Sequence, residues 1–297
     1  MFRCSIVESW IKPLVTGLRG SRLTLHGVRE HLRTSESGVV AVTFGATVGA
    51  VCRSVVRDAV GNPIRLTSGA KVIVIPTMGD PLGNFDQQRA NTSSAIAESL
   101  SHAFADAAPP PSLNGVWPVL PLAIPDDRVE AFRDGLWRKH SGYAAVFGAA
   151  ANSQDALIGK SDIILSSAGF FHSPYWEHYG NADVDQTALA QRDEIRDLAE
   201  GDIAGVLVRK SELTDPQADR FESIMRHWMG IDIKEIKRVA QQSAEAGLGA
   251  PAGCVLCCIG HKAEIVKHLI CVERVVNHLP CDQELLAELS RLVSKPA

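Results

Sequence analysis

The chain has 297 residues and a formal net charge of −4 at pH 7, with 45% hydrophobic and 22% charged residues. This balance matches an ordinary soluble globular protein, long enough to bury a substantial core in one large or two smaller domains. With 30 basic residues against 34 acidic ones, the sequence lacks the excess of positive charge that is typical of nucleic-acid-binding proteins.

The seven cysteines are odd in number and scattered, which argues against a secreted disulfide framework and for a reducing compartment. Glu8 and Lys12 interrupt the apolar residues near the start, so no core of signal-peptide length forms there. No window approaches the roughly 20 apolar residues of a membrane span. We therefore expect a soluble, cytoplasmic protein that does not contact a membrane.

Residues 1–37 lack strong strand patterns and are predicted to form an N-terminal helical extension, with 38–297 as the main domain. From there on, short apolar runs alternate with helical patterns. The run 38–43 precedes a helical segment at 47–58, and the run 71–76 precedes a longer helical segment at 87–107. Further strand-like runs lie at 144–147, 162–165, 204–208, 254–257 and 273–276.

Continuous Val/Ile runs without alternation are typical of parallel strands that are covered on both faces. Strands that alternate with helices form βαβ units, so the predicted fold is α/β, an open and mainly parallel sheet with helices on both faces. The proline-rich segment 107–112 is the strongest break in the pattern. We interpret it as a connection within one domain, and a linker between two independent domains is the alternative.

Small, hydroxyl and charged residues gather in the turns next to these runs, and in open parallel sheets ligands bind past the carboxyl ends of the strands. Each turn alone is ordinary, with Lys262 a solvated lysine and Asp202 a turn cap. Together they predict a ring of binding residues at one edge, in which Thr47 and Lys262 contribute to one anion site. The candidate ligand-binding residues are Gly45, Thr47, Gly79, Asp80, Asn91, Gly169, Asp202 and Lys262.

The sequence contains no phosphate loop and no correctly spaced dinucleotide fingerprint, so we expect no nucleotide and no other cofactor. Cys254 and Cys257 have CxxC spacing inside an apolar run and are predicted to pack in a buried strand. The aromatic segment 170–179 either packs in the core or closes over a ligand. Its Glu177 and His178 lack the regular spacing of metal ligands, so no metal site is predicted.

Three segments resemble the sugar-binding domain of SorC/DeoR-type bacterial transcriptional regulators. Residues 44–47 (FGAT) resemble the Gly-x-Thr effector loop of that family, and residues 200–205 (EGDIAG) its Gly-Asp-Ile-x-Gly turn. Lys262, followed by a helix, a strand and residues 282–289 (DQELLAEL), is similar to its closing lysine–helix–strand–aspartate–helix unit. The resemblance covers about residues 35–295.

The resemblance implies a fold related to glucosamine-6-phosphate deaminase and ribose-5-phosphate isomerase, a phosphorylated-sugar ligand, and a dimer or tetramer. The sequence departs from the family pattern at Cys258 and Ile259, where two glycines are usual, and at Ala46, where a second hydroxyl is common. Family regulators also carry an N-terminal helix-turn-helix, for which residues 1–37 offer too little room. We therefore expect no DNA binding by this chain alone.

Two functional hypotheses of different classes follow. The first is the binding of a phosphorylated sugar or related carbohydrate as an effector in a transcriptional-regulator-like protein. The alternative is a sugar-phosphate isomerase or deaminase that uses the same cleft, with Asp202, Glu177 and His178 as the candidate acid–base residues. A partner-binding protein with a degenerate cleft is a third interpretation.

Overall fold

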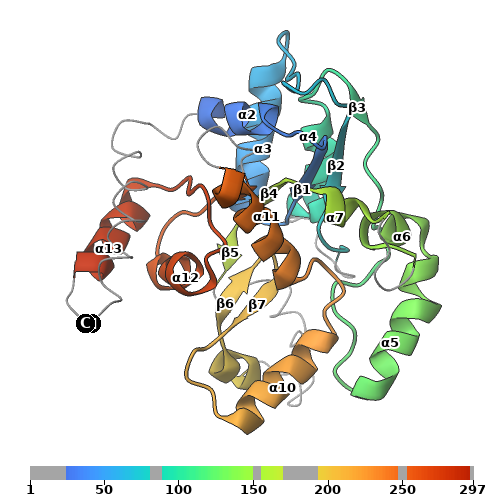
Figure 1. Ribbon diagram of the computed structural model, residues 1–297, viewed down its shortest axis with the longest axis vertical. Coiled ribbons are helices and arrows are strands. Elements are labelled where there is room, and N and C mark those ends of the chain that lie inside the picture. The colour runs from blue at the N-terminus through green and yellow to red at the C-terminus, as the bar shows by residue number, and fades with distance from the viewer. Residues whose placement is uncertain (1–24, 81–88, 150–154, 170–192, 247–252, 295–297) are drawn as a thin grey trace.

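The computed structural model describes residues 25–80, 89–149, 155–169, 193–246 and 253–294. Its main sheet has five parallel strands (Figure 1). In spatial order these strands are β3 (Ala107–Ala108), β2 (Val72–Pro76), β1 (Val39–Val42), β4 (Ile163–Ser166) and β8 (Gly253–Leu256). The strands before and after the proline-rich segment 107–112 therefore belong to one sheet.

Both faces of the main sheet are buried, as the continuous apolar runs predict. In β1, Val39 and Ala41 join one core cluster, while Val40 and Val42 join the other. The second cluster is completed by α2 (Leu25–Arg33), α3 (Ala46–Ala59) and α4 (Ser93–Ser101). Each fully buried aliphatic side chain in these layers contributes about 1.5–3 kcal/mol.

The cluster on the opposite face includes apolar residues from α5 to α7 and from helices of the C-terminal half (Figure 1). α2 packs against the rest of the domain, because its residues Val28 and Leu32 are buried in the second cluster. The helices not yet given are α5 (Asp126–Gly135), α6 (Ser141–Phe147), α7 (Leu157–Lys160), α10 (Asp215–Arg226), α11 (Ile233–Ala246), α12 (Ala263–His268) and α13 (Gln283–Ser294). Short 3-10 turns lie at η1 (Arg89–Asn91) and η2 (Trp137–Lys139), and a π-helical turn, η4 (Leu269–Glu273), follows α12.

A second, antiparallel sheet is formed by β5 (Ala168–Gly169), β6 (Ala199–Ile203) and β7 (Val206–Arg209). β6 and β7 are joined by Ala204 and Gly205, which both have positive φ angles of 58° and 82°. A two-residue hairpin turn of this kind requires φ above zero at both positions, and glycine adopts it without strain. The prediction of a parallel strand at 204–208 is therefore wrong in its direction, because this strand pairs antiparallel.

Two predicted strands are absent from the described residues. Residues 144–147 form the end of α6, whose start is capped by the His140 ring accepting the Tyr143 N–H at 3.3 Å. Residues 273–276 follow η4, and Arg274 takes a left-handed conformation with φ 57° that ends it. Val275 and Val276 are buried without strand pairing. The helix predicted over 87–107 ends at Ser101, before β3.

No helix among the described residues is both long and apolar enough to cross a membrane.

Candidate functional site

The strands of the main sheet are parallel, so β1, β2, β4 and β8 all end at one edge, which we call the carboxyl edge. Thr47 follows β1 and Lys262 follows β8, with β4 between these two strands. Neighbouring strands lie about 4.8 Å apart, which puts the ends of β1 and β8 roughly 10 Å from each other. Thr47 and Lys262 therefore lie on the same edge of the sheet.

The first turn of α3 is open to a ligand. The helix begins after Gly45 with no side-chain cap and no acidic residue in its first turn, and Thr47 is half-buried there. Gly45 has φ 126°, and an added Cβ would lie 2.9 Å from Ser167 Oγ. Glycine is required here because the backbone of this turn approaches the β4–β5 turn closely. An uncapped N-terminus of a 14-residue helix attracts anions.

Asn91 and Gly79 hold this edge together through structural contacts. The Asn91 side-chain oxygen accepts a hydrogen bond from Arg53 at 3.0 Å, and its backbone oxygen accepts one from the Gly45 N–H at 2.9 Å. Gly79 is buried against the backbone carbonyl of Val116, where an added Cβ would collide. Both residues therefore shape the turns around Gly45 and β2, and both oxygens of Asn91 already accept hydrogen bonds.

Asp80 is a largely buried carboxyl group just beyond β2. Burial raises its pKa, and contacts with Ser94 and Thr92 oppose the shift. Its buried Oδ1 has no hydrogen-bond partner among the residues that the structure describes. An unsatisfied buried oxygen is costly and favours a donor from outside. Asp80 Oδ1 can accept a hydrogen bond from a hydroxyl group of a ligand.

Lys262 reaches back from the start of α12 to the antiparallel sheet. Its ammonium donates a hydrogen bond to the Ala168 carbonyl at 2.7 Å, and the residue is half-buried. Ala168 also donates its N–H to Cys258 Sγ at 3.4 Å. α12 has only six residues, so the anion-binding capacity at this end of the site comes from the ammonium group. The Lys262 ammonium has three donors, and one of them is used here.

Asp202 lies next to this lysine as a buried acid, with 3% of its surface exposed. Its Oδ1 accepts the Gly205 N–H at 3.0 Å. Its cross-strand partner is Gly169, where an added Cβ would collide with the carboxylate. Burial raises the pKa of Asp202 to about 7, although the Gly205 N–H and the charge of Lys262 oppose the shift. The group can therefore gain or lose a proton near neutral pH.

Ser167 joins the two halves of the site. Its hydroxyl donates to the Phe44 carbonyl at 3.4 Å, next to Gly45, and its carbonyl accepts the Ala204 N–H at 3.2 Å, next to Asp202. Ser167 was not among the predicted site residues, although two serines directly after an apolar run were a usable signal. Cys258 and Gly205 were also missed, because their roles depend on contacts between distant segments.

Glu177 and His178 lie outside the described residues. Within the described part of the chain, no three His, Cys, Asp or Glu side chains gather in a way that could hold a metal ion. The CxxC cysteines Cys254 and Cys257 are buried, as predicted for packing in a strand. Burial raises the pKa of Cys254 to about 12, which keeps its thiol protonated and unreactive.

No protein-family model and no curated protein matches the sequence. Solved structures with a similar fold do exist. A sor operon regulator from Shigella flexneri is 14% identical with a TM-score of 0.51, over 92% of this chain and 90% of the other. A structure described as the sugar-binding domain of a transcriptional repressor from Vibrio fischeri is 13% identical with a TM-score of 0.54, over 91% and 87%.

The full-length sorbitol operon regulator SorC from Klebsiella pneumoniae is 14% identical with a TM-score of 0.50, over 88% of this chain and 72% of the other. At these identities the likeness concerns the fold. The α/β fold of the sugar-binding domains of transcriptional regulators, which residues 44–47, 200–205 and 262–289 indicated, is therefore confirmed.

The raised pKa of Asp202 makes the stability of the fold depend on pH. Between about pH 4 and 7 the folded state keeps a proton that the unfolded chain has released. The free energy of unfolding should therefore fall as the pH rises through this window, by up to about 1.4 kcal/mol per pH unit from this group. Asp202→Asn should remove that part of the slope.

Urea denaturation at several pH values from 4 to 8 would measure both slopes, with the exposed Asp219→Asn as the matched control. A wild-type slope that Asp202→Asn leaves unchanged would contradict the assignment of a raised pKa to Asp202.

Proposed function

We propose that the carboxyl edge binds a phosphorylated sugar or related carbohydrate, which acts as the effector of a transcriptional-regulator-like protein. The observation that carries this proposal is the position of the Lys262 ammonium on the same edge as the uncapped N-terminus of α3. These are the two kinds of group that bind phosphate in proteins. The printed descriptions of the structural relatives, sugar-binding domains and operon regulators, support the same ligand class.

In this proposal the two ends of the site have different tasks. Thr47, the N–H groups at the start of α3 and the Lys262 ammonium hold the phosphate. Asp80 and Asp202, both largely buried carboxyl groups, accept or donate hydrogen bonds to sugar hydroxyls. Gly45 and Gly169 permit the close approach of the backbone that these contacts need. The roles of Gly79 and Asn91 are to shape the two turns.

Replacing Lys262 tests the phosphate contact. A charge-assisted hydrogen bond contributes roughly 1.5–3 kcal/mol. Lys262→Ala should therefore weaken the binding of a phosphorylated ligand by roughly 10- to 150-fold. Calorimetric titration of a panel of aldose and ketose phosphates, and of their unphosphorylated parents, would measure the change. Lys267→Ala in the last turn of the same helix is the matched control and should bind as wild type. Equal losses for phosphorylated and unphosphorylated sugars would contradict the assigned contact.

The alternative function, a sugar-phosphate isomerase or deaminase, is supported by one observation, the raised pKa of Asp202. A carboxyl group with a pKa of about 7 beside a lysine has the properties of a general base or acid for proton transfer next to a sugar carbonyl. The group is 3% exposed, so a substrate must displace its present neighbours to reach it. We therefore prefer the effector-binding function to the enzyme alternative.

NMR analysis of the same titration samples separates the two functions. We expect binding of the sugar phosphate without conversion into an isomer or a deaminated product. If conversion does occur, Asp202→Asn should abolish it, because the amide does not ionise near neutral pH and cannot serve as a general acid or base. Conversion that survives replacement of Asp202, Glu177 and His178 together would remove all three as catalytic candidates.

We further propose that the chain is a cytoplasmic homo-oligomer, dimer or tetramer, and that it does not bind DNA by itself. Non-specific DNA binding comes almost entirely from cationic residues that displace counterions, and this chain has 30 basic against 34 acidic residues. No electrophoretic mobility shift is therefore expected at about 0.15 M salt. A clean shift by the purified chain alone would contradict this proposal.

A further inference from the structure

A separate cavity of about 690 Å³ opens between α5, α6 and α7 on one side and β7, α10 and the start of α11 on the other. Its size is within the range of roughly 300–1,000 Å³ typical of small-molecule sites. None of the candidate residues of the carboxyl edge lines it. β7 is the outer strand of the antiparallel sheet, whereas Asp202 lies on the central strand β6. The cavity is therefore distinct from the proposed sugar-phosphate site.

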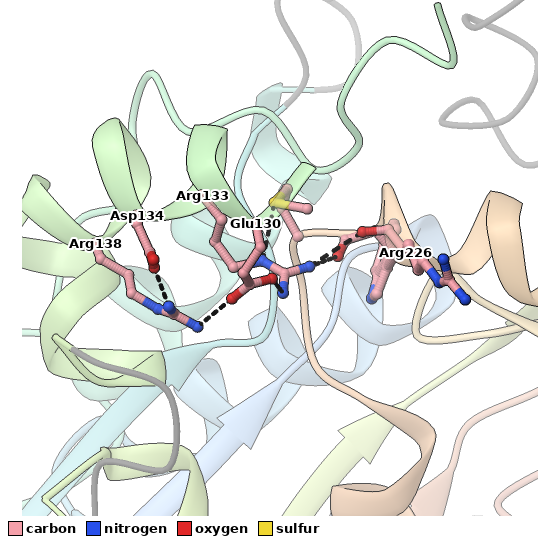
Figure 2. A network of polar contacts seen from close by, with 7 residues as sticks. Glu130, Arg133, Asp134, Arg138 and Arg226 are labelled. Carbon is pink, nitrogen blue, oxygen red and sulfur yellow. Dashed lines mark hydrogen bonds and ion pairs between the residues drawn. The ribbon is translucent and has the colours of Figure 1, made fainter. Parts of the chain in front are cut away.

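One wall of the cavity is fixed by a polar network centred on Arg133 (Figure 2). Arg133 pairs with Glu130 of its own helix at 2.6 Å and donates to the backbone carbonyls of Arg226 and Trp228 at 3.1 and 3.3 Å. These carbonyls lie at and just beyond the end of α10, where helices have unsatisfied acceptors. Arg138 extends the network by pairing with Glu130 at 2.8 Å. α5 is thereby held over α10, and the cavity is formed without a ligand.

Part of the cavity lining is apolar and aromatic. Phe147, Phe221 and Trp228 line it, together with the aliphatic side chains of Val206 and Leu207. These residues also belong to the main core or pack against it, so their positions are fixed by the fold. Such a lining favours a ligand with a flat ring.

Tyr143 places a hydroxyl group next to the aromatic part of this lining. Tyr143 is only 4% exposed and its ring packs against Phe147, with ring centres 4.8 Å apart and the ring planes tilted by 43°. Its hydroxyl makes no hydrogen bond within the part of the chain that the structure describes, and burial raises its pKa. A buried tyrosine hydroxyl usually finds a partner. Since the residue lines the cavity, a bound molecule can supply that partner.

The charges around the cavity do not select a charged ligand. Four basic side chains line it against five acidic ones. Arg133 pairs with Glu130, Arg138 pairs with both Glu130 and Asp134, and Arg226 lies 3.4 Å from Asp126. These three guanidinium groups are therefore already paired, in contrast to Lys262 at the carboxyl edge, whose ammonium donates to an uncharged carbonyl.

From this combination we propose that the cavity is a second binding site, which takes an uncharged molecule with an aromatic ring and one hydroxyl or carbonyl group. The ring packs among Phe147, Phe221 and Trp228, and the polar group forms a hydrogen bond with the Tyr143 hydroxyl. This proposal does not depend on the sugar-phosphate site.

Phenol is a suitable probe, with benzene as the analogue that lacks the hydroxyl and benzoate as the charged analogue. Ligand-observed and protein-observed NMR on the full chain should show saturable binding of phenol and weaker binding of benzoate. Tyr143→Phe keeps the ring and removes one hydrogen bond. It should therefore weaken the binding of phenol by roughly 2- to 12-fold and leave the binding of benzene unchanged.

Gly159 permits a blocking variant that should fold. It lines the cavity, and an added Cβ at this position meets no other atom within 4 Å. Gly159→Trp should therefore fill the cavity and abolish phenol binding. The matched control is Gly135→Trp on α5, where a Cβ is equally unhindered but does not line the cavity.

The proposal is overturned if phenol does not bind saturably, if benzoate binds as tightly as phenol, or if Tyr143→Phe and Gly159→Trp both bind phenol as wild type does. None of these results bears on sugar-phosphate binding, which is measured with different ligands and through Lys262.

Discussion

The passage of the chain from β4 into β5 is the constraint on which the candidate site depends. β4 pairs with β1 on one side and β8 on the other, and its last residue accepts the Cys257 N–H at 2.7 Å. Directly afterwards the chain leaves the main sheet and begins the antiparallel one. Ser167 contacts Phe44 and Ala204 at this point. The turn after β1, the lysine after β8 and the acid on β6 are thereby held around one short segment.

This geometry also explains the electrostatic character of the site. Asp202 is buried because the hairpin of β6 and β7 packs against the core, and Lys262 is half-buried because its ammonium binds the Ala168 carbonyl. When two opposite charges are buried near each other, their attraction is smaller than the hydration free energy that both groups lose. Further hydrogen-bond partners are needed to make up the difference. A ligand with a phosphate and hydroxyl groups would provide such partners, which is the physical reason for a binding role of this edge.

Much of the main sheet could be predicted from the sequence, because β1, β2, β4 and β8 are continuous apolar runs buried on both faces. The run 144–147 was misassigned, since four apolar residues fit a buried helix as well as a strand. β6 was not recognised as a strand because its residues, AEGDI, include two acids and a glycine. The placement of Thr47 and Lys262 on one edge follows from the parallel sheet. The contacts of Lys262 with Ala168 and of Asn91 with Arg53 arise from tertiary packing, which the local sequence does not encode.

The central claim is that Thr47 and Lys262 bind the same phosphate, although they are more than 200 residues apart in the sequence. A double-mutant cycle measures this directly, with Thr47→Val, Lys262→Met and the combined variant titrated with the tightest-binding sugar phosphate of the panel. Two side chains that hold one anion should show a coupling free energy of about 0.5–3 kcal/mol. Strictly additive losses in the double variant would show that the two residues act independently and would contradict a single anion site.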